Sequence, residues 1–83
     1  MRLSIPYGEV RRISKQWAQE TERTGATIST SAWTFDGGTV ASETLVTPLT
    51  TALVTPTTDG LLINTVTLSN GETRIASWDI EVC

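Results

Sequence analysis

The chain has 83 residues, of which 39% are hydrophobic and 18% are charged, with a formal net charge of −3. This length supports one small domain with a modest core, and no apolar run approaches the roughly 20 residues that cross a bilayer. The negative charge argues against nucleic acid as the main partner, because phosphate binding needs concentrated Lys and Arg. The N-terminal residues do not resemble a secretory leader, so we expect synthesis in a cytoplasm.

Hydroxyl side chains dominate the composition, with 23 Ser or Thr residues, 16 of which are Thr. Threonine is β-branched and suits a pleated, half-buried surface. The excess favours strands. It also predicts a surface whose neutral hydroxyls can bond a partner at little cost in charge desolvation.

Residues 1–8, MRLSIPYG, alternate weakly, with Leu3, Ile5 and Tyr7 on one side. We expect this segment to be an arm ahead of a single domain at 9–83. An arm of this kind can add a strand to the exposed sheet edge of a neighbouring subunit, where backbone hydrogen bonds supply affinity. Leu3, Ile5 and Tyr7 are therefore candidate interface residues.

The next segment, residues 9–18, is ambiguous between strand and helix. Val10, Ile13 and Trp17 could share one helical face. We favour a strand because the rest of the chain has β patterns, and a short helix remains the alternative. Its basic residues, Arg11, Arg12 and Lys15, form either a solvated strand face or a contact for an anion or an acidic partner.

Residues 26–35, ATISTSAWTF, are predicted to form a strand that ends at the turn Asp36-Gly37-Gly38. Ile28 and Trp33 have opposite parity, so both can face the core only if a bulge shifts the register between them. Residues 39–45 are predicted to form the return strand.

A short repeat follows: the sequence LVTP occurs at 45–48 and again at 53–56. Proline lacks an N–H and is excluded from central strands, so Pro48 and Pro56 should bound a short segment. One interpretation is an edge strand or loop protected against aggregation. The other is an uncharged ridge that docks on another subunit, with Pro48, Leu49 and Pro56 as candidate contacts.

The C-terminal part predicts a hairpin, with strands at 61–69 and 72–82 around Asn70-Gly71. Asn-Gly favours a type I′ turn, in which both central residues have positive φ. The last strand alternates strictly, which indicates one face in a core and one in water. The residues expected to face the core are Ala76, Trp78, Ile80 and Val82.

Five to seven short antiparallel strands with Gly, Asn, Asp and Pro turns predict a small β-sandwich. Trp33 and Trp78 are the natural core anchors, and each indole N–H is expected to need a partner. A platform that stacks on a ligand is the alternative role for these rings.

The sequence lacks histidine and the motifs of common catalytic sites. No phosphate-binding or nucleophile motif occurs. Cys83 is expected to be a free thiol. Asp36 and Asp59 lie beside glycines and could hold calcium, although turn chemistry explains them. We therefore expect no enzyme activity, no cofactor and no metal site.

GATISTSAWTF, followed by LLINTVTLSNGETRIASWDIEV, resembles a family of small bacteriophage virion proteins with an immunoglobulin-like (Ig-like) sandwich. The resemblance covers roughly residues 14–82. RRISKQWAQE is more basic than the opening of that family, and ASWDIEV lacks its usual arginines. The matching positions are Trp17, Ile28, Ser31, Trp33, Leu68, Gly71, Thr73, Ile80 and Val82.

The resemblance implies an all-β fold, a small Ig-like antiparallel β-sandwich, and a virion location. It implies an adaptor that joins a fiber to the tail or neck through contacts with other virion proteins, in several copies within a symmetric assembly. A capsid decoration protein that clamps the shell through the segment from Pro48 to Pro56 is a variant. A carbohydrate-binding module, with Trp17, Trp33 or Trp78 stacked on a sugar, is the alternative from another class.

Overall fold

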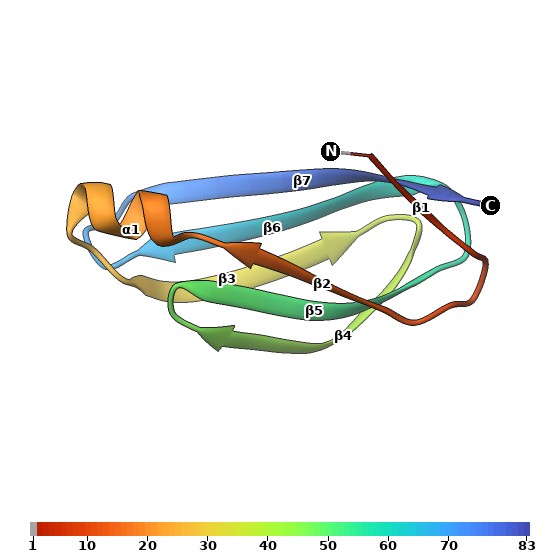
Figure 1. The fold of residues 1–83 in the computed structure, drawn as a ribbon, viewed down its shortest axis with the longest axis horizontal. Helices are drawn as coiled ribbons and strands as arrows, with labels where there is room; N and C mark the ends of the chain where they lie inside the picture. The colour runs from red at the N-terminus through yellow and green to blue at the C-terminus, as the bar shows by residue number, and fades with distance from the viewer. Residues whose placement is uncertain (1) are drawn as a thin grey trace.

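Two β-sheets pack face to face, and a short helix lies at one end (Figure 1). The computed structural model describes residues 2–83, apart from the side chain of Glu20. In this part of the chain, seven strands and one helix occur in the order β1 (Arg2–Ile5), β2 (Arg11–Gln16), α1 (Ala18–Thr24), β3 (Ile28–Phe35), β4 (Gly38–Val46), β5 (Leu49–Pro56), β6 (Gly60–Leu68) and β7 (Thr73–Val82).

Apart from β1, the sheet order matches that of an Ig-like domain. Sheet A has the order β1-β7-β6-β3, and sheet B has the order β2-β5-β4. Strands β2, β5 and β4 correspond to strands B, E and D of an Ig domain, and β3, β6 and β7 correspond to C, F and G. The predicted small all-β sandwich is confirmed. Within residues 2–83 the paired strands are antiparallel, except that β1 runs parallel to β7.

The expected arm at residues 1–8 belongs largely to the sandwich itself. Arg2–Ile5 forms β1 and pairs with β7, and Ile5 is fully buried in the core. Met1 lies outside the described residues. The prediction of a strand held free for a neighbour is therefore wrong for β1, because its apolar residues complete the core of their own chain.

The ambiguous segment at 9–18 contains the favoured strand and leads into a helix. Arg11–Gln16 is β2, and α1 begins at Ala18, after Trp17. Residues 18–23, AQETER, are mostly good helix formers, and Gly25 ends the helix in the left-handed conformation with φ +71. The helix carries the chain from sheet B to sheet A.

The predicted bulge in β3 is confirmed. Ile28 and Trp33 are both buried, and the register against β6 shifts between Ile28 and Thr30. The extra residue reverses the parity of the strand, so both side chains reach the core.

The predicted return strand is present but pairs elsewhere. β4 crosses to sheet B and pairs with β5, not with β3. Gly38 permits this crossing, because a Cβ there would overlap the carbonyl oxygen of Thr55. A bulge lies between Ala41 and Thr44, and Ser42 within it has φ +52.

The segment between the two prolines is the central strand of sheet B, so the edge-strand interpretation is wrong. β5 lies between β2 and β4. Pro48 lies in the turn before β5, after a cis Thr47-Pro48 peptide. Pro56 lies beyond Val54, the last residue of β5 that pairs with β2. A missing N–H is tolerated at both places because neither lies inside the three-stranded part of the ladder.

The hairpin of β6 and β7 is confirmed, but its turn is not type I′. Among the described non-glycine residues only Ser42 has positive φ, so Asn70 does not have the required conformation. Gly71, with φ +91, donates to the carbonyl of Leu68 at 2.9 Å, and Leu68 donates to the carbonyl of Glu72. This pattern matches a three-residue loop with a glycine bulge. The Asn70 side chain accepts from the backbone N–H of Glu72.

The core between the sheets has two clusters of buried residues. The larger contains Trp33 and Trp78 with Ile5, Ile13, Ala52, Val54, Leu62 and Ile80. The smaller contains Trp17, Ala26, Ile28, Val66 and Leu68, and Ala76 packs against both. The predicted inward face of β7 is confirmed, since Trp78 and Ile80 are buried and Ala76 and Val82 are half-buried.

Candidate protein-binding face

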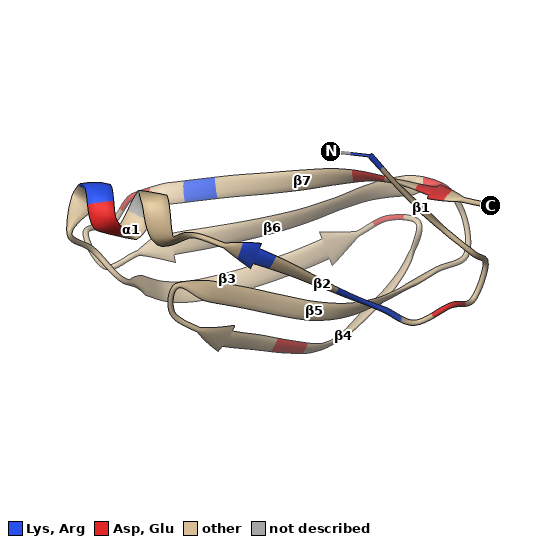
Figure 2. Cartoon of the chain, viewed as in Figure 1, with Lys and Arg blue, Asp and Glu red and all other residues tan. Residues whose placement is uncertain are grey.

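Charged residues gather at the ends and edges of the molecule (Figure 2). Strands β3, β5 and β6 carry no charged residue. The carboxylates of Asp36 and Asp59 accept from the backbone N–H groups of Leu61 and Val82, at 2.7 and 2.8 Å. Both aspartates therefore stabilise turns and strand ends. Among the described residues, no group of three or more His, Cys, Asp or Glu could hold a metal ion, and no helix is long and apolar enough to cross a membrane.

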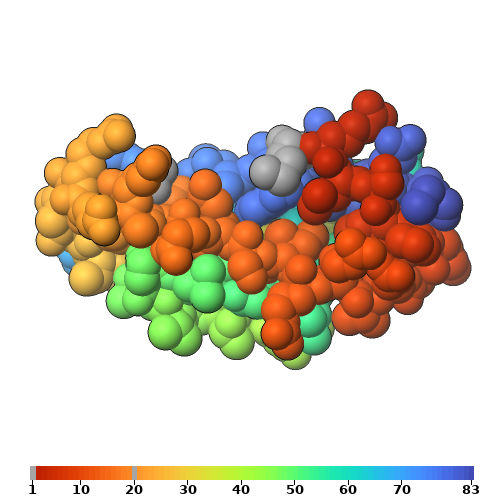
Figure 3. All heavy atoms as spheres, viewed as in Figure 1, coloured from red at the N-terminus to blue at the C-terminus, as the bar shows by residue number. Residues whose placement is uncertain are grey.

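The outer face of sheet B has few charged residues and carries a hollow. We call it the hydroxyl face. The register of the ladder places Leu49, Thr51, Leu53 and Thr55 of β5 on it, opposite Ser14 of β2 and Thr44 of β4. Among the described residues at the outward positions of this ladder, only Arg12 is charged. In Figure 3 the side chains of β2, in orange, and of β4 and β5, in green, occupy the middle and lower part of the near side.

A hollow of about 480 Å³ lies in the hydroxyl face. The β4 bulge contributes to it, because Ser42 has left the regular ladder. Towards α1, two apolar residues extend the surface: Val46 pairs with Leu49, and both are exposed. The hollow is lined by Arg12, Ser14, Ser42, Thr44, Leu49, Thr51 and Leu53.

The bulge also directs a carboxylate to the edge of the opposite sheet. Glu43 accepts from the backbone N–H of Trp33 at 3.1 Å. β3 is an edge strand, and such N–H groups are free to pair with another chain. Glu43 therefore occupies one donor of this edge.

The predicted interface residues do not form one surface. Pro48 and Leu49 lie at the α1 end of β5, and Leu49 belongs to the hydroxyl face. Pro56 is buried at the opposite end, where its carbonyl accepts from Gly8. Of the N-terminal candidates, Ile5 is in the core, Leu3 is half-buried against it, and Tyr7 is exposed.

The basic cluster of β2 divides between two sides of the strand. Arg11 pairs with Glu9. Lys15 lies over the Trp17 ring at 5.3 Å from its centroid. Arg12 alone contributes to the hydroxyl face, so the three residues do not form one anion site.

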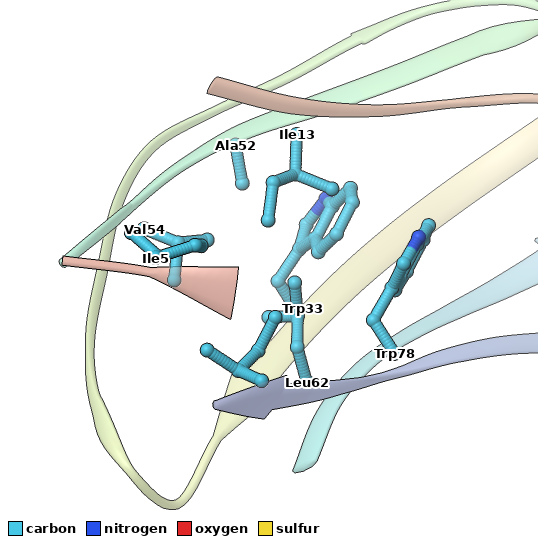
Figure 4. Packing of buried hydrophobic residues seen from close by; sticks show 8 residues of the cluster. Ile5, Ile13, Trp33, Ala52, Val54, Leu62 and Trp78 are labelled. Atoms are coloured by element: carbon cyan, nitrogen blue, oxygen red, sulfur yellow. The ribbon is translucent and has the colours of Figure 1, made fainter. Parts of the chain in front are cut away.

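The tryptophans of the chain are all buried, so none offers a ring face to a sugar. Trp33 and Trp78 are confirmed as core anchors: their rings stack with centroids 5.5 Å apart and an interplanar angle of 18°, and Figure 4 shows them among the surrounding aliphatic side chains. The expectation that each indole N–H has a hydrogen-bond partner is wrong for Trp33, because its Nε1 has none among the described residues. Its neighbours Ile13, Ala52 and Leu62 have no side-chain acceptor.

Trp17 is a third core anchor that the sequence interpretation missed, and it takes part in a buried polar network. Its Nε1 donates to Thr50 Oγ1 at 3.1 Å and to Asn64 Oδ1 at 3.2 Å. Thr50 Oγ1 donates to Asn64 Oδ1 at 2.6 Å. Asn64 Nδ2 donates to Ser31 Oγ and to the carbonyl of Ala32, at 3.0 and 3.1 Å. The sequence signal was Asn64 itself, a polar residue at a core position of an apolar strand.

No protein-family model matches this chain, and no curated protein matches it.

Proposed function

We propose that this chain is a non-catalytic structural protein of a bacteriophage virion, an adaptor that joins a fiber to the tail or neck. The observation that carries the proposal is the hydroxyl face, an open surface with apolar residues, hydroxyls and a hollow. The centres of protein–protein interfaces are depleted of charged residues. The assignment to a virion rests on the resemblance of residues 14–82 to small virion proteins.

In this proposal the face binds mainly through apolar side chains and hydroxyls, with Arg12 as its one charged group among the described residues. Leu49 and Leu53 supply apolar area, and Thr51 between them shares one hydrogen bond with Ser14 Oγ at 3.1 Å, which leaves its hydroxyl oxygen able to accept a further one. Covering such groups avoids the desolvation cost of charges. Val46 and Leu49, exposed and directly opposite each other, are the natural anchor of the contact.

The test places a charge at the centre of the hydroxyl face. Thr51→Arg changes an outward residue of β5, and Thr65→Arg is the matched control at an outward position of β6 in sheet A. Each variant is supplied to particles that lack the chain, and incorporation is measured by immunoblotting of purified particles. We expect at least a tenfold loss for Thr51→Arg, since an unpaired buried charge is costly, and near-normal incorporation for Thr65→Arg.

Immunogold labelling of the same particles locates the protein. Label at the tail or neck supports the adaptor, and label over the shell would replace it by a decoration protein. Absence of the wild-type chain from purified particles contradicts the whole proposal. Normal incorporation of Thr51→Arg, or a loss confined to Thr65→Arg, contradicts the role of the hydroxyl face.

A further inference from the structure

Strand β1 is attached to the sandwich differently from the other strands. It has four residues and pairs only with β7, in parallel. Residues 6–10 then lead from sheet A to β2 in sheet B. This linker lies at the end of the molecule opposite α1 (Figures 1 and 3).

The place that β1 fills must remain filled for the core to stay closed. Ile5 is 0% exposed and belongs to the cluster that contains Val54, Leu62 and Ile80. Leu3 packs against the same cluster. An empty β1 position would expose these residues to water, which the hydrophobic effect opposes. An occupant that restores the contacts is a strand of identical sequence.

The linker leaves two large side chains mostly exposed in the single chain. Tyr7 is 69% exposed and Val10 is 60% exposed. Its backbone is held by hydrogen bonds from Gly8 N–H to the Pro56 carbonyl, at 3.0 Å, and from Glu9 N–H to the Pro6 carbonyl, at 3.1 Å. The second of these lies within the linker and would be lost if the linker became extended.

We propose that β1 exchanges between two copies of this chain, so that each copy's β1 pairs with β7 of the other. The contacts of β1 itself are repeated in the exchanged pair, including the register Leu3↔Ile80 and the ion pair of Arg2 with Glu81. Exchange of an identical element is a low-cost route to a dimer. The five linker residues reach at most about 17 Å when extended, which is enough to pass to a neighbour that lies edge to edge.

The exchanged pair also accounts for the exposed linker. The two linkers cross side by side between the copies, and Tyr7 and Val10 of one can cover those of the other. This inference goes beyond the proposed function, because its partner is a second copy of this chain and not another virion protein.

The test locks β1 to its own β7. Ser4 and Glu81 are register partners on the outward side of the sheet. Neighbouring strands lie about 4.8 Å apart, within the Cα range of disulfides. Ser4→Cys with Glu81→Cys, in a Cys83→Ser background, should therefore form a disulfide within one chain. The matched control, Thr30→Cys with Thr67→Cys in the same background, joins β3 to β6 and leaves β1 free.

Each protein is refolded from urea at micromolar to millimolar concentration, and its mass is measured by light scattering after size exclusion. We expect a dimer fraction that rises with concentration for the wild-type chain and for the control. The oxidised Ser4/Glu81 variant should stay monomeric, and reduction should restore its dimer. A monomeric wild-type chain at every concentration overturns the proposal, and so does a dimer that persists in the oxidised Ser4/Glu81 variant.

A second measurement detects the exchanged strand directly. The Ser4→Cys chain and the Glu81→Cys chain, both in the Cys83→Ser background, are refolded together and oxidised. Mass spectrometry should find a disulfide between residue 4 of one chain and residue 81 of the other. Its absence in a sample that contains dimers overturns the exchange and assigns the dimer to another surface.

Discussion

Replacing Asn64 by alanine tests whether the buried polar network holds the two sheets together. Asn64 makes four hydrogen bonds in the core, to Trp17, Thr50, Ser31 and Ala32. A buried neutral hydrogen bond contributes about 1 kcal/mol. The hydrogen bond between Trp17 and Thr50 remains in the variant and keeps these two groups partly satisfied. We therefore expect the loss of the four bonds to lower the free energy of unfolding by about 3 kcal/mol rather than about 4. The void left by the amide adds less than about 1 kcal/mol.

A loss of about 3 kcal/mol is large for this chain. An 83-residue domain has a free energy of unfolding of roughly 4–12 kcal/mol. With a urea slope of about 1 kcal/mol/M, low because the domain is small, the midpoint should fall by about 3 M. Urea unfolding followed by circular dichroism and tryptophan fluorescence measures it.

Two threonine variants calibrate this result. Thr50→Val removes one hydroxyl from the network, while Trp17 keeps Asn64 as an acceptor, so we expect a loss of about 1 kcal/mol. Thr65→Val makes the same chemical change on the outer face of β6, where water replaces the lost partner, and should change little. The reasoning is refuted if Asn64→Ala lowers the midpoint by less than about 1 M, or if the two threonine variants are equally stable.

Three further predictions concern the hairpin turn and β1. The pKa of Glu72 is lowered by the hydrogen bond from Arg74, then by that from Asn70 and then by the charge of Arg74. The ionised Glu72 should therefore stabilise the fold at neutral pH, and this contribution should be lost as the pH falls through the lowered pKa. An NMR titration should show that Arg74→Gln raises the pKa of Glu72 towards its usual value. Gly71→Ala should cost about 1–2 kcal/mol in urea unfolding, because φ is +91 and no atom crowds the site; an unchanged midpoint would contradict the turn geometry. Ile5→Ala should cost about 2–5 kcal/mol in the same assay, since this side chain is fully buried; a neutral result would mean that β1 is free.

Local patterns predicted local structure well. The opposite parity of Ile28 and Trp33 required a bulge, and the register of β3 shifts between Ile28 and Thr30. The alternation of residues 76–82 gave the buried face of β7. These features depend on neighbouring residues alone, because the side chains of a strand alternate with period two.

The choice of strand partner could not be obtained in this way. The prolines at 48 and 56 indicated where a strand must end, but not that it lies between β2 and β4. The glycines at 37 and 38 marked a turn, but the close approach of Gly38 to β5 is a contact with a segment distant in sequence. The hydroxyl face depends on both facts, so of its residues the sequence identified only Leu49.

The network around Asn64 joins the same two strands that a disulfide joins in antibody domains. There the bridge runs between strands B and F, beside a tryptophan on strand C. Here Trp17 directly follows β2, at position B, and bonds Asn64 on β6, at position F. Trp33 lies on β3, at position C, and stacks on Trp78. A disulfide acts mainly on the unfolded chain, whereas these hydrogen bonds act only in the folded one.

The stability of this domain should therefore not depend on redox conditions. Cys83 is exposed and free, so a reducing agent should leave the urea midpoint unchanged, while Asn64→Ala lowers it. If the urea midpoint of a monomeric sample falls when a reducing agent is added, hydrogen bonds are not what links the two sheets. Linking strands B and F through the Trp17 N–H and the Asn64 side chain, without a disulfide, lets the sandwich form under reducing conditions as well as under oxidising ones.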